Sequence, residues 1–397
     1  MPAFVPFRAL RYAPGSDLDA VTAPPYDVLS AADVDRLAAH HRHNVVHIDV
    51  PRGDDPYAGA AHLLTRWLDE GVLVADPTTS FTIYRMSFTD AAGNPRSISG
   101  VLGGLEVVDE GAGGVLPHER TTPKARTDRL DLTRATSANL SPVWGLSLAS
   151  GLSEALARPG EILGRVEIGQ VTHQVERVTD PERLAEISAI IAADDVLIAD
   201  GHHRYAISRT YRDEVRATTG DADTAAEYTL TFINELIDDQ LSVEAIHRVY
   251  SGITHAALRT ALAESFDLAP APPVSPELLA TMAATGRLVL LAPDGTAEWL
   301  TPRPGRFDDL RALDGAWLED ALAATTAEVD YQHGLTEVLA LLGSGAADAA
   351  VLIRPTTVAE IERTGREGLL MPPKSTFFTP KLRTGFVIRP TAERAEN

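Results

Sequence analysis

The chain has 397 residues, 44% of them hydrophobic and 23% charged, an ordinary globular composition with enough apolar residues for a substantial core. It contains no cysteine, which excludes disulfides, a thiolate nucleophile and cysteine-ligated zinc or iron–sulfur centres. A net charge of −21 disfavours a nucleic-acid partner, because a protein that binds the phosphate backbone needs a basic face.

The sequence also lacks the patterns of membrane insertion and secretion. No apolar run approaches the roughly 20 residues that are needed to span a bilayer. The first eight residues have neither the charged start nor the apolar run of a signal peptide. We therefore expect a cytoplasmic protein with no membrane partner, and a homodimer remains an open alternative.

The first third of the chain predicts a mixture of strands and helices. Strands are expected over residues 4–12, 45–50, 81–88 and 97–108. Ser30, with Asp33 three residues later, is typical of a helix start, and residues 57–70 have helical spacing. The turn Pro24-Pro25-Tyr26-Asp27 is stiff, and it is either purely structural or part of a site.

The remainder of the chain continues the mixture. Asp180-Pro181 is typical of a helix N-terminus, and a short buried strand at 196–199 precedes a helix over 202–218. Further strands are expected over residues 164–179, 229–237 and 247–250. Residues 269–276 contain four prolines and are the most linker-like stretch. Because strands and helices do not alternate regularly, we expect an α+β fold rather than a doubly wound sheet.

The strongest chemical signal is Asp200-Gly201-His202-His203-Arg204, at the end of the strand over 196–199. Gly201 permits a tight turn, and the free N–H groups and dipole of the following helix favour an anion. The two histidines and the arginine would compensate the charge of such an anion. The alternatives are Asp200 as an ordinary helix cap with solvated histidines, or a metal site through His202 and His203.

A second signal lies in residues 116–129. Thr122-Pro123 predicts the start of a helix, and Glu119 precedes it among basic residues. A carboxylate held there can accept a proton from a substrate hydroxyl. The alternative is a surface cluster of salt bridges. The basic residues of this segment are Arg120, Lys124, Arg126 and Arg129.

Lysine is rare in this chain. Only Lys124, Lys374 and Lys381 occur among 35 basic residues, and they lie in two short segments, 118–134 and 371–389. An ammonium on a flexible stem is not interchangeable with a guanidinium, so we expect at least one of these lysines to contact an anionic ligand.

The segment from Met371 to Gly385 combines Lys374, Ser375, Thr376 and Lys381 without any acid. It is not a P-loop, because proline precedes Lys374 and the glycine spacing is wrong. Its hydroxyl and ammonium groups nevertheless suit phosphate oxygens. The alternative is a pair of C-terminal strands with ordinary surface lysines.

Taken together, these motifs resemble one family, the domain-of-unknown-function family 1015, over about residues 4–390. The resemblance rests on four segments: Pro25-Tyr26-Asp27-Val28, His118-Glu119-Arg120-Thr121 followed by Asp128-Arg129, Asp200-Gly201-His202-His203-Arg204-Tyr205-Ala206, and Met371-Pro372-Pro373-Lys374-Ser375-Thr376. The central part also resembles the ParB/sulfiredoxin superfamily, one branch of which consists of free-serine kinases that make O-phosphoserine.

This resemblance implies an α+β fold with a mixed-sheet, ParB/sulfiredoxin-like core and α/β elaborations at both ends. We expect an N-terminal α/β region over 1–110, a core with both chemical segments over 111–267, and a C-terminal α/β region over 268–397 that closes the site. The spacing between the two chemical segments is longer than in the compact kinases, so the core must accommodate an insertion.

The resemblance also implies a small-molecule kinase that transfers a phosphoryl group from ATP, ADP or pyrophosphate to the hydroxyl of free L-serine, with Mg²⁺ bridging phosphate oxygens and helped by Asp200. The expected catalytic residues are Glu119, Asp200 and His202. The expected substrate-binding residues are Asp27, His118 and Thr121. The expected phosphate- or nucleotide-binding residues are Lys124, Arg129, Gly201, His203, Arg204, Lys374, Ser375, Thr376 and Lys381.

Two other functions fit the same sequence. A ParB-like protein can bind a nucleotide and switch conformation without phosphorylating a small molecule. The same residues can also hydrolyse a phosphoester.

Overall fold

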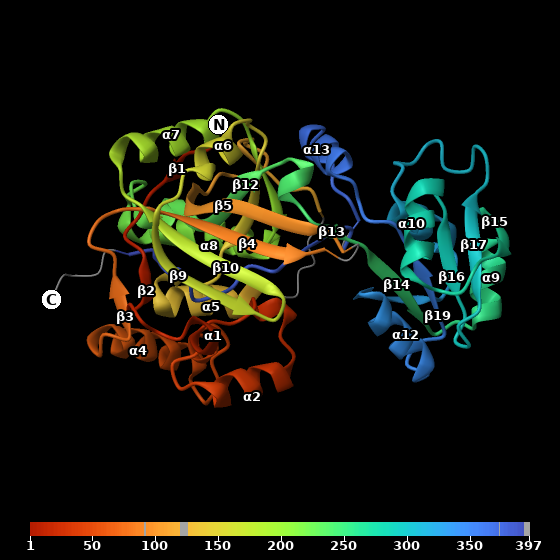
Figure 1. Ribbon diagram of the computed structural model, residues 1–397, viewed down its shortest axis with the longest axis horizontal. Helices are drawn as coiled ribbons and strands as arrows, with labels where there is room; N and C mark the ends of the chain where they lie inside the picture. Colours follow the sequence, from red (N-terminus) through yellow and green to blue (C-terminus); the bar gives the residue numbers. More distant parts are fainter. Residues whose placement is uncertain (91–92, 120–125, 373, 393–397) are drawn as a thin grey trace. The chain divides into compact units, whose positions relative to one another are not determined.

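The computed structural model describes residues 1–90, 93–119, 126–372 and 374–392, and it divides the chain into two compact units. Unit 1 comprises Met1–Leu241, Gly365–Gly368 and Pro380–Asn397, and unit 2 comprises Ser242–Thr364 and Leu369–Thr379. Both units combine a sheet with helices (Figure 1). The expected α+β class is thereby confirmed.

Unit 1 is built on a nine-stranded mixed sheet with the order β6-β11-β8-β12-β5-β4-β10-β9, in which β1 also pairs with β5. Two neighbouring pairs, β6/β11 and β8/β12, are parallel, and the other described pairs are antiparallel. The strands are β1 (Phe4–Val5), β4 (Phe81–Thr89), β5 (Pro95–Glu106), β6 (Val115–Leu116), β8 (Val143–Ser147), β9 (Glu161–Ile168), β10 (Val171–Val178), β11 (Val196–Asp200) and β12 (Tyr228–Glu235).

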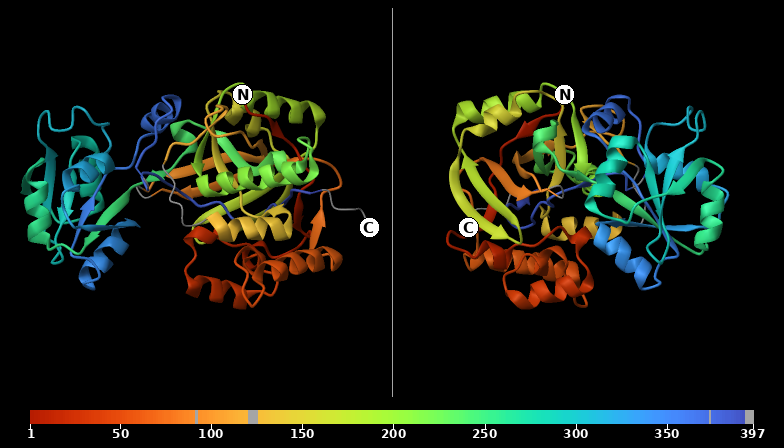
Figure 2. Two further views of the ribbon diagram at one scale, coloured as in Figure 1. Left: turned by 180° about the vertical axis from the view of Figure 1, so that it is seen from behind. Right: turned by 45° about the vertical axis from the view of Figure 1, so that its right-hand side comes forward.

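The helices of unit 1 form two groups around this sheet. Helices α6 and α7 pack on it through Leu152, Ile187 and Ile191, which join one buried apolar cluster with Phe81 and Val101. Helix α8 contacts α5, and α5 contacts α4 (Figure 2). The helices are α1 (Leu18–Val21), α2 (Ala31–His40), α3 (Val46–Asp49), α4 (Pro56–Asp69), α5 (Arg126–Thr136), α6 (Leu152–Ala157), α7 (Pro181–Ile191) and α8 (His202–Thr219).

Short strand pairs complete unit 1. Strand β2 (Leu10–Tyr12) pairs with β3 (Leu73–Ala75), and β7 (Ala138–Asn139) pairs with β21 (Arg389–Pro390). The second pair ties the C-terminal segment to the strand that follows α5.

Unit 2 is a six-stranded antiparallel sheet with the order β15-β17-β16-β19-β14-β18. Alternate residues of β16 enter different apolar clusters, Leu288 and Leu290 on one face and Val289 and Leu291 on the other. Because successive side chains of a strand point to opposite faces, both faces of this sheet are covered. The strands are β14 (Ile246–Ser251), β15 (Phe266–Pro270), β16 (Leu288–Leu291), β17 (Ala297–Pro302), β18 (Glu328–His333) and β19 (Ala349–Leu352).

The covering helices of unit 2 belong to these two clusters. Helices α9 (His255–Leu262) and α11 (Asp314–Leu322) supply one, and α10 (Pro276–Thr285) and α12 (Leu335–Gly343) supply the other. The chain continues through α13 (Val358–Arg366), and a small pair joins β13 (Val243–Glu244) to β20 (Phe377–Phe378).

Several local predictions are confirmed because their signals are short-range. Ser30 and Asp33 form a reciprocal capping box at the start of α2. Asp180 accepts a hydrogen bond from the Arg183 N–H at the start of α7. The strands expected over 81–88 and 97–108 are β4 and β5.

The strand predicted over residues 45–50 is wrong, because this segment contains helix α3. The Asn44 amide donates to the carbonyl oxygens of Ala20 (2.8 Å) and Thr22 (3.2 Å), and its own oxygen accepts from the Val46 N–H at 3.0 Å. Asn44 thus starts a helical turn that is buried on nearly every side. In so buried a segment, alternation of apolar residues does not distinguish a strand from a helix.

Two longer-range expectations also differ from the structure. Residues 4–12 form β1 and β2 instead of one strand, and Pro6, which has no N–H for a ladder, follows the end of β1. The proline-rich stretch at 269–276 runs within unit 2, from the end of β15 to Ser275, which caps α10. The two units meet along the chain between Leu241 and Ser242, and the three regions expected over 1–110, 111–267 and 268–397 stay a prediction.

Candidate functional site

The candidate site is built where β11 ends and α8 begins, as the sequence predicted. Four residues of β11 are buried, and the strand ends at Asp200. Gly201 has a left-handed φ of 86°, and a Cβ there would lie 3.1 Å from the Arg204 guanidinium. Helix α8 begins directly at His202, and no side chain of the described residues caps its N-terminus. The N–H groups of a helix's first turn have no carbonyl partner within the helix, so this end favours an anion.

Asp200 is held between two cations. Its Oδ2 lies 3.2 Å from Arg204 Nη2 and 3.4 Å from Lys381 Nζ. Burial alone would raise the pKa of Asp200, but Lys381 and Arg204 hold that pKa well below its ordinary value. Asp200 is therefore ionised at neutral pH, and one of the three scarce lysines lies at the predicted anion site.

Arg204 links Asp200 to the N-terminal turn of the chain. Its side chain is only 10% exposed, and its Nη2 also lies 3.5 Å from Asp27 Oδ2. Its Nη1 donates to the carbonyl oxygen of Pro142. Asp27, expected from the sequence as a substrate-binding residue, thus lies beside the Asp200 pair.

Two buried histidines flank the same helix start. The His118 Nδ1 lies 2.6 Å from the carbonyl oxygen of Ile198, and the rings of His118 and His202 are 5.0 Å apart. Burial lowers the pKa of His118 to about 4 and, with a contribution from His118, lowers the pKa of His202 to about 3. Both rings are neutral at pH 7. The crowding of positive charge that the sequence suggested at this helix start is therefore reduced.

Strand β6, which precedes Glu119 in the chain, lies beside β11 in the sheet. Strands β6 and β11 are parallel, with Val115 opposite Val196 and Leu116 opposite Leu197. Beyond this pairing, the contact of His118 Nδ1 with the Ile198 carbonyl oxygen keeps His118 beside the end of β11. The His118-Glu119 segment and the Asp200 segment are therefore neighbours although they are far apart in the sequence.

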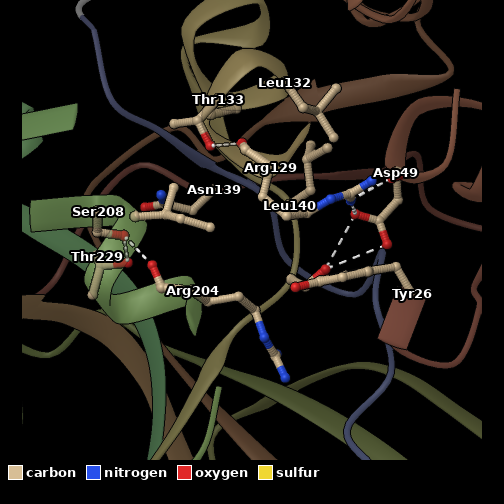
Figure 3. A pocket seen from close by; sticks show the side chains of 13 residues that line it. Tyr26, Asp49, Arg129, Leu132, Thr133, Asn139, Leu140, Arg204, Ser208 and Thr229 are labelled. Atoms are coloured by element: carbon tan, nitrogen blue, oxygen red, sulfur yellow. Dashed lines mark hydrogen bonds and ion pairs between the residues drawn. The ribbon is translucent and has the colours of Figure 1, made fainter. Parts of the chain in front are cut away.

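A small hollow lies next to Arg204, which forms part of its lining (Figure 3). Figure 3 shows Tyr26, Asp49 and Arg129 together on one side of it and Asn139, Ser208 and Thr229 on the opposite side. Its cavity volume of about 50 Å³ suits a few water molecules or one very small ligand. We call this the Asp49 hollow; its lining residues are Tyr26, Asp49, Arg129, Leu132, Thr133, Ala138, Asn139, Leu140, Ser141, Arg204, Ile207, Ser208 and Thr229.

The Asp49 carboxylate is buried but weakly bonded. Arg129 Nη1 donates at 2.5 Å to the Asp49 backbone oxygen, yet it lies 3.3 Å from Oδ1. The Ser141 hydroxyl lies 3.3 and 3.4 Å from the two carboxylate oxygens. Burial raises the pKa of Asp49 despite the opposing charge of Arg129. The Arg129 guanidinium also stacks 4.1 Å from the centre of the Tyr26 ring.

The sequence did not single out Asp49 or Ser141, although it predicted Arg129 as a phosphate ligand and placed Tyr26 in a turn that is either structural or part of a site. Asp49 lies in a segment that the sequence predicted to be a strand, so a role in the site was not expected. The one sequence feature that could have indicated it is an acidic residue inside the apolar run Val45–Val50. Its partner Arg129 lies on α5. Helix α5 contacts α4, and α4 contacts α3, the helix that contains Asp49.

Not every predicted residue lies in this region. Lys124 and Thr121 are outside the described residues. Lys374, Ser375 and Thr376 belong to unit 2, where the Lys374 backbone oxygen accepts from Arg248 and the Ser375 hydroxyl donates to the Pro372 oxygen. Their participation in the site stays a prediction.

The described residues do not assemble a protein-ligated metal centre. No group of three or more histidine, aspartate or glutamate side chains among them is arranged to hold a metal ion. Within the same residues, no helix is both long and apolar enough to cross a membrane.

Comparison with solved structures gives only distant likeness. A conserved hypothetical protein from Pyrococcus furiosus is 14% identical, with a TM-score of 0.39, over 70% of this chain and 92% of that chain. A free serine kinase in complex with AMP is 13% identical, with a TM-score of 0.38, over 69% and 89%. SbnI from Staphylococcus aureus is 12% identical, with a TM-score of 0.39, over 72% and 87%. These values are too low to transfer a ligand or an activity.

Comparison at the level of sequence gives a family but no characterised relative. No protein of curated function matches the chain. One family model, described as "Protein of unknown function (DUF1015)", matches residues 4–316, a span that contains Asp27, Glu119 and the Asp200–Arg204 segment. The family expected from these motifs is thereby confirmed, and the chain belongs to the DUF1015 family of proteins of unknown function.

Proposed function

We propose that this protein is a phosphotransferase that moves a phosphoryl group from ATP, ADP or pyrophosphate to the hydroxyl of free L-serine. The observation that carries the proposal is the convergence of Asp200, Arg204 and Lys381 at the N-terminus of α8, where His118 contacts the end of β11. The ParB/sulfiredoxin-like description of the core is part of the same proposal.

The donor phosphates would bind at the start of α8. The N–H groups of its first turn and the positive end of its dipole attract phosphate oxygens. Lys381 and Arg204 add two positive charges beside them, and Gly201 lets the backbone approach closely. His202 and His203 would contribute ring N–H groups; His202 does so as a neutral ring.

Asp200 is the residue that would contact a metal ion bound to the donor phosphates. Arg204 and Lys381 both contact its Oδ2. Mg²⁺ commonly binds through one or two carboxylates together with substrate phosphates, so one carboxylate oxygen is sufficient. When bound there, Mg²⁺ would neutralise developing charge on the phosphate oxygens. Asp200 would be the residue that holds the metal ion, and Arg204 would fix the position of its carboxylate.

The acceptor would bind in the Asp49 hollow. The long contacts of the Asp49 carboxylate leave it poorly satisfied for a buried charge, and an incoming ammonium group would supply shorter ones. The Nη2 of Arg129 has no acceptor among the described residues and suits a carboxylate. A hollow that recognises an ammonium and a carboxylate and holds few atoms matches a small amino acid. Asp27, His118 and Thr121 would line the path from it to the phosphates.

The chemical step needs one proton acceptor. Glu119 would take the proton from the serine hydroxyl as the hydroxyl oxygen bonds to phosphorus and the bond to the leaving phosphate oxygen breaks. The leaving group departs with the displaced charge on its phosphate. The rest of the contribution of the protein is positioning and charge neutralisation.

The decisive experiment is an assay for phosphoserine. The purified protein is incubated with L-serine, Mg²⁺ and ATP, ADP or pyrophosphate in turn, and the product is followed by ³¹P NMR. We expect phosphoserine with at least one donor, and a loss of at least 100-fold in Glu119→Gln. Glu110→Gln is the matched control, because the Glu110 side chain is 91% exposed.

Other results of this assay, of a thermal-shift measurement and of a phosphate-release assay would point to a different function. No phosphoserine with any donor contradicts the proposal. Thermal stabilisation by nucleotide without coupling to serine would identify a nucleotide-binding regulator, because a kinase binds both ligands at one site. Phosphate release from phosphoserine without an acceptor would identify a hydrolase.

A further inference from the structure

A second concave site lies in unit 1 between the N-terminal helices. Helices α2, α3 and α4 enclose a groove with a cavity volume of about 420 Å³, within the range of small-molecule sites. We call it the α2–α4 groove. It is lined by Val34, Ala38, Val46, His47, Val50, Pro51, Arg52, Pro56, Gly59, Ala60, His62, Leu63 and Arg66.

The interior of this groove is apolar. Val34, Val46 and Ala60 are buried and form its floor, while Ala38 and Leu63 are half-buried along its sides. The aliphatic side chains leave an open volume rather than filling it. Such a surface favours an apolar ligand by removing hydrocarbon from water.

The rim of the groove is basic in a strongly acidic protein. The chain carries a net charge of −21, yet the lining contains two arginines and two histidines and no acid. Arg52 is paired with Asp35, and its other nitrogen reaches the Ala31 carbonyl oxygen at 3.4 Å. Arg66 is exposed, and no carboxylate lies within 4.0 Å of it among the described residues. One guanidinium at the rim is thus available to an anion.

We propose that the α2–α4 groove binds an amphipathic monocarboxylate, with its aliphatic chain on the apolar floor and its carboxylate on Arg66. Charge complementarity selects this class, because a neutral apolar ligand would leave the basic rim unused and a small anion would leave the floor in water. The proposal is independent of the phosphotransferase activity, because the groove and the α8 site use different residues.

Gly59 offers a direct way to close the groove. It lies in the first turns of α4, and a Cβ added there would meet no atom within 4 Å. A leucine side chain at this position would therefore grow into the open volume without a clash. Leucine and alanine are both better helix formers than glycine, so neither variant should destabilise α4.

The test is isothermal titration of the full chain with butyrate, octanoate, decanoate and neutral octanol. We expect Kd to fall about fourfold for each added methylene and octanol to bind at least fivefold more weakly than octanoate. Gly59→Leu should abolish octanoate binding, whereas Gly59→Ala should retain it. Arg66→Gln should weaken octanoate to the affinity of octanol and leave octanol unchanged.

Several results would overturn this inference. Absence of saturable binding by decanoate, or binding that is unchanged in Gly59→Leu, would do so. A change from dimer to monomer in Gly59→Leu, measured by light scattering without any ligand, would show that a second copy of the chain occupies the groove. Retained thermal stability of both Gly59 variants is the check that they fold.

Discussion

The contact between Lys381 and Asp200 can be measured by a double-mutant cycle. The variants are Lys381→Met, Asp200→Asn and the double variant, all of which keep the side-chain volume close to the original. The cycle isolates the pairwise interaction from the contacts that each residue makes elsewhere, including the Asp200 contact with Arg204. It therefore tests whether the C-terminal segment meets the predicted anion site.

The expected coupling follows from distance and burial. Two unit charges 3.4 Å apart attract by roughly 5 kcal/mol at an effective dielectric constant of about 20. The side chains are 17% and 27% exposed, so solvent screening and the cost of desolvation offset much of this attraction. We expect a coupling free energy of about 1–3 kcal/mol at pH 7.

The coupling should depend on pH in a defined direction. Because Lys381 and Arg204 outweigh burial and lower the pKa of Asp200 in the folded protein, the stabilisation is fully present above the ordinary carboxyl pKa of 3.8. It is lost as the pH falls further towards the lowered pKa, where the carboxylate becomes protonated. Salt should weaken it only modestly, because the pair is mostly buried.

Urea unfolding at pH 7 and pH 3 measures the four free energies of unfolding, because the coupling is fully present at the first pH and reduced at the second. Arg42→Met is the control, because Arg42 is an exposed cation outside this site, and we expect a change within about 0.5 kcal/mol. Additivity of the two single substitutions within about 0.5 kcal/mol would refute the contact and the phosphate site built on it.

Three further predictions concern local structure and pH. Asn44→Ala should destabilise unit 1 by about 2–4 kcal/mol in urea unfolding, because it leaves two carbonyl oxygens and one N–H without their partner. Gly201→Ala should cost about 1–3 kcal/mol by the same measurement, since φ is 86° and the new methyl group would crowd Arg204. Because burial lowers the pKa of His118 from 6.5 to about 4, His118 contributes stability that is present above pH 6.5 and lost as the pH falls to 4; the loss is about 3 kcal/mol. His118→Gln should flatten the pH profile of the unfolding free energy over this range, and the exposed His62→Gln should leave the profile unchanged.

The β11–α8 junction was predictable because each of its signals is local. A buried apolar run, a glycine and an amphipathic helix follow one another without a gap, and each signal acts within a few residues. The same holds for the caps at Ser30 and Asp180. Local hydrogen bonds of this kind do not depend on the remainder of the fold.

The partners of that junction were not predictable from the pattern. Lys381 was singled out by its rarity, but nothing in its neighbourhood indicates that Asp200 is its counter-ion. The unit boundary at Leu241 likewise has no local signal, since the chain returns to unit 2 at 369–379 and to unit 1 at Pro380. Prolines at 270–276 mark a stiff connection, and stiffness alone does not separate domains.

Helix α3 is the element at which the two proposed ligand sites meet. Val46 and His47 line the α2–α4 groove, whereas Asp49, at the other end of the same four-residue helix, lines the Asp49 hollow. So short a helix has little internal hydrogen bonding, and its position depends on Asn44 at one end and Arg129 at the other. A carboxylate ligand that changes the position of α3 when it fills the groove would therefore also move the Asp49 carboxylate. By linkage, an amino acid bound to Asp49 would change the affinity of the groove by the same factor, so the coupling can be measured from either site.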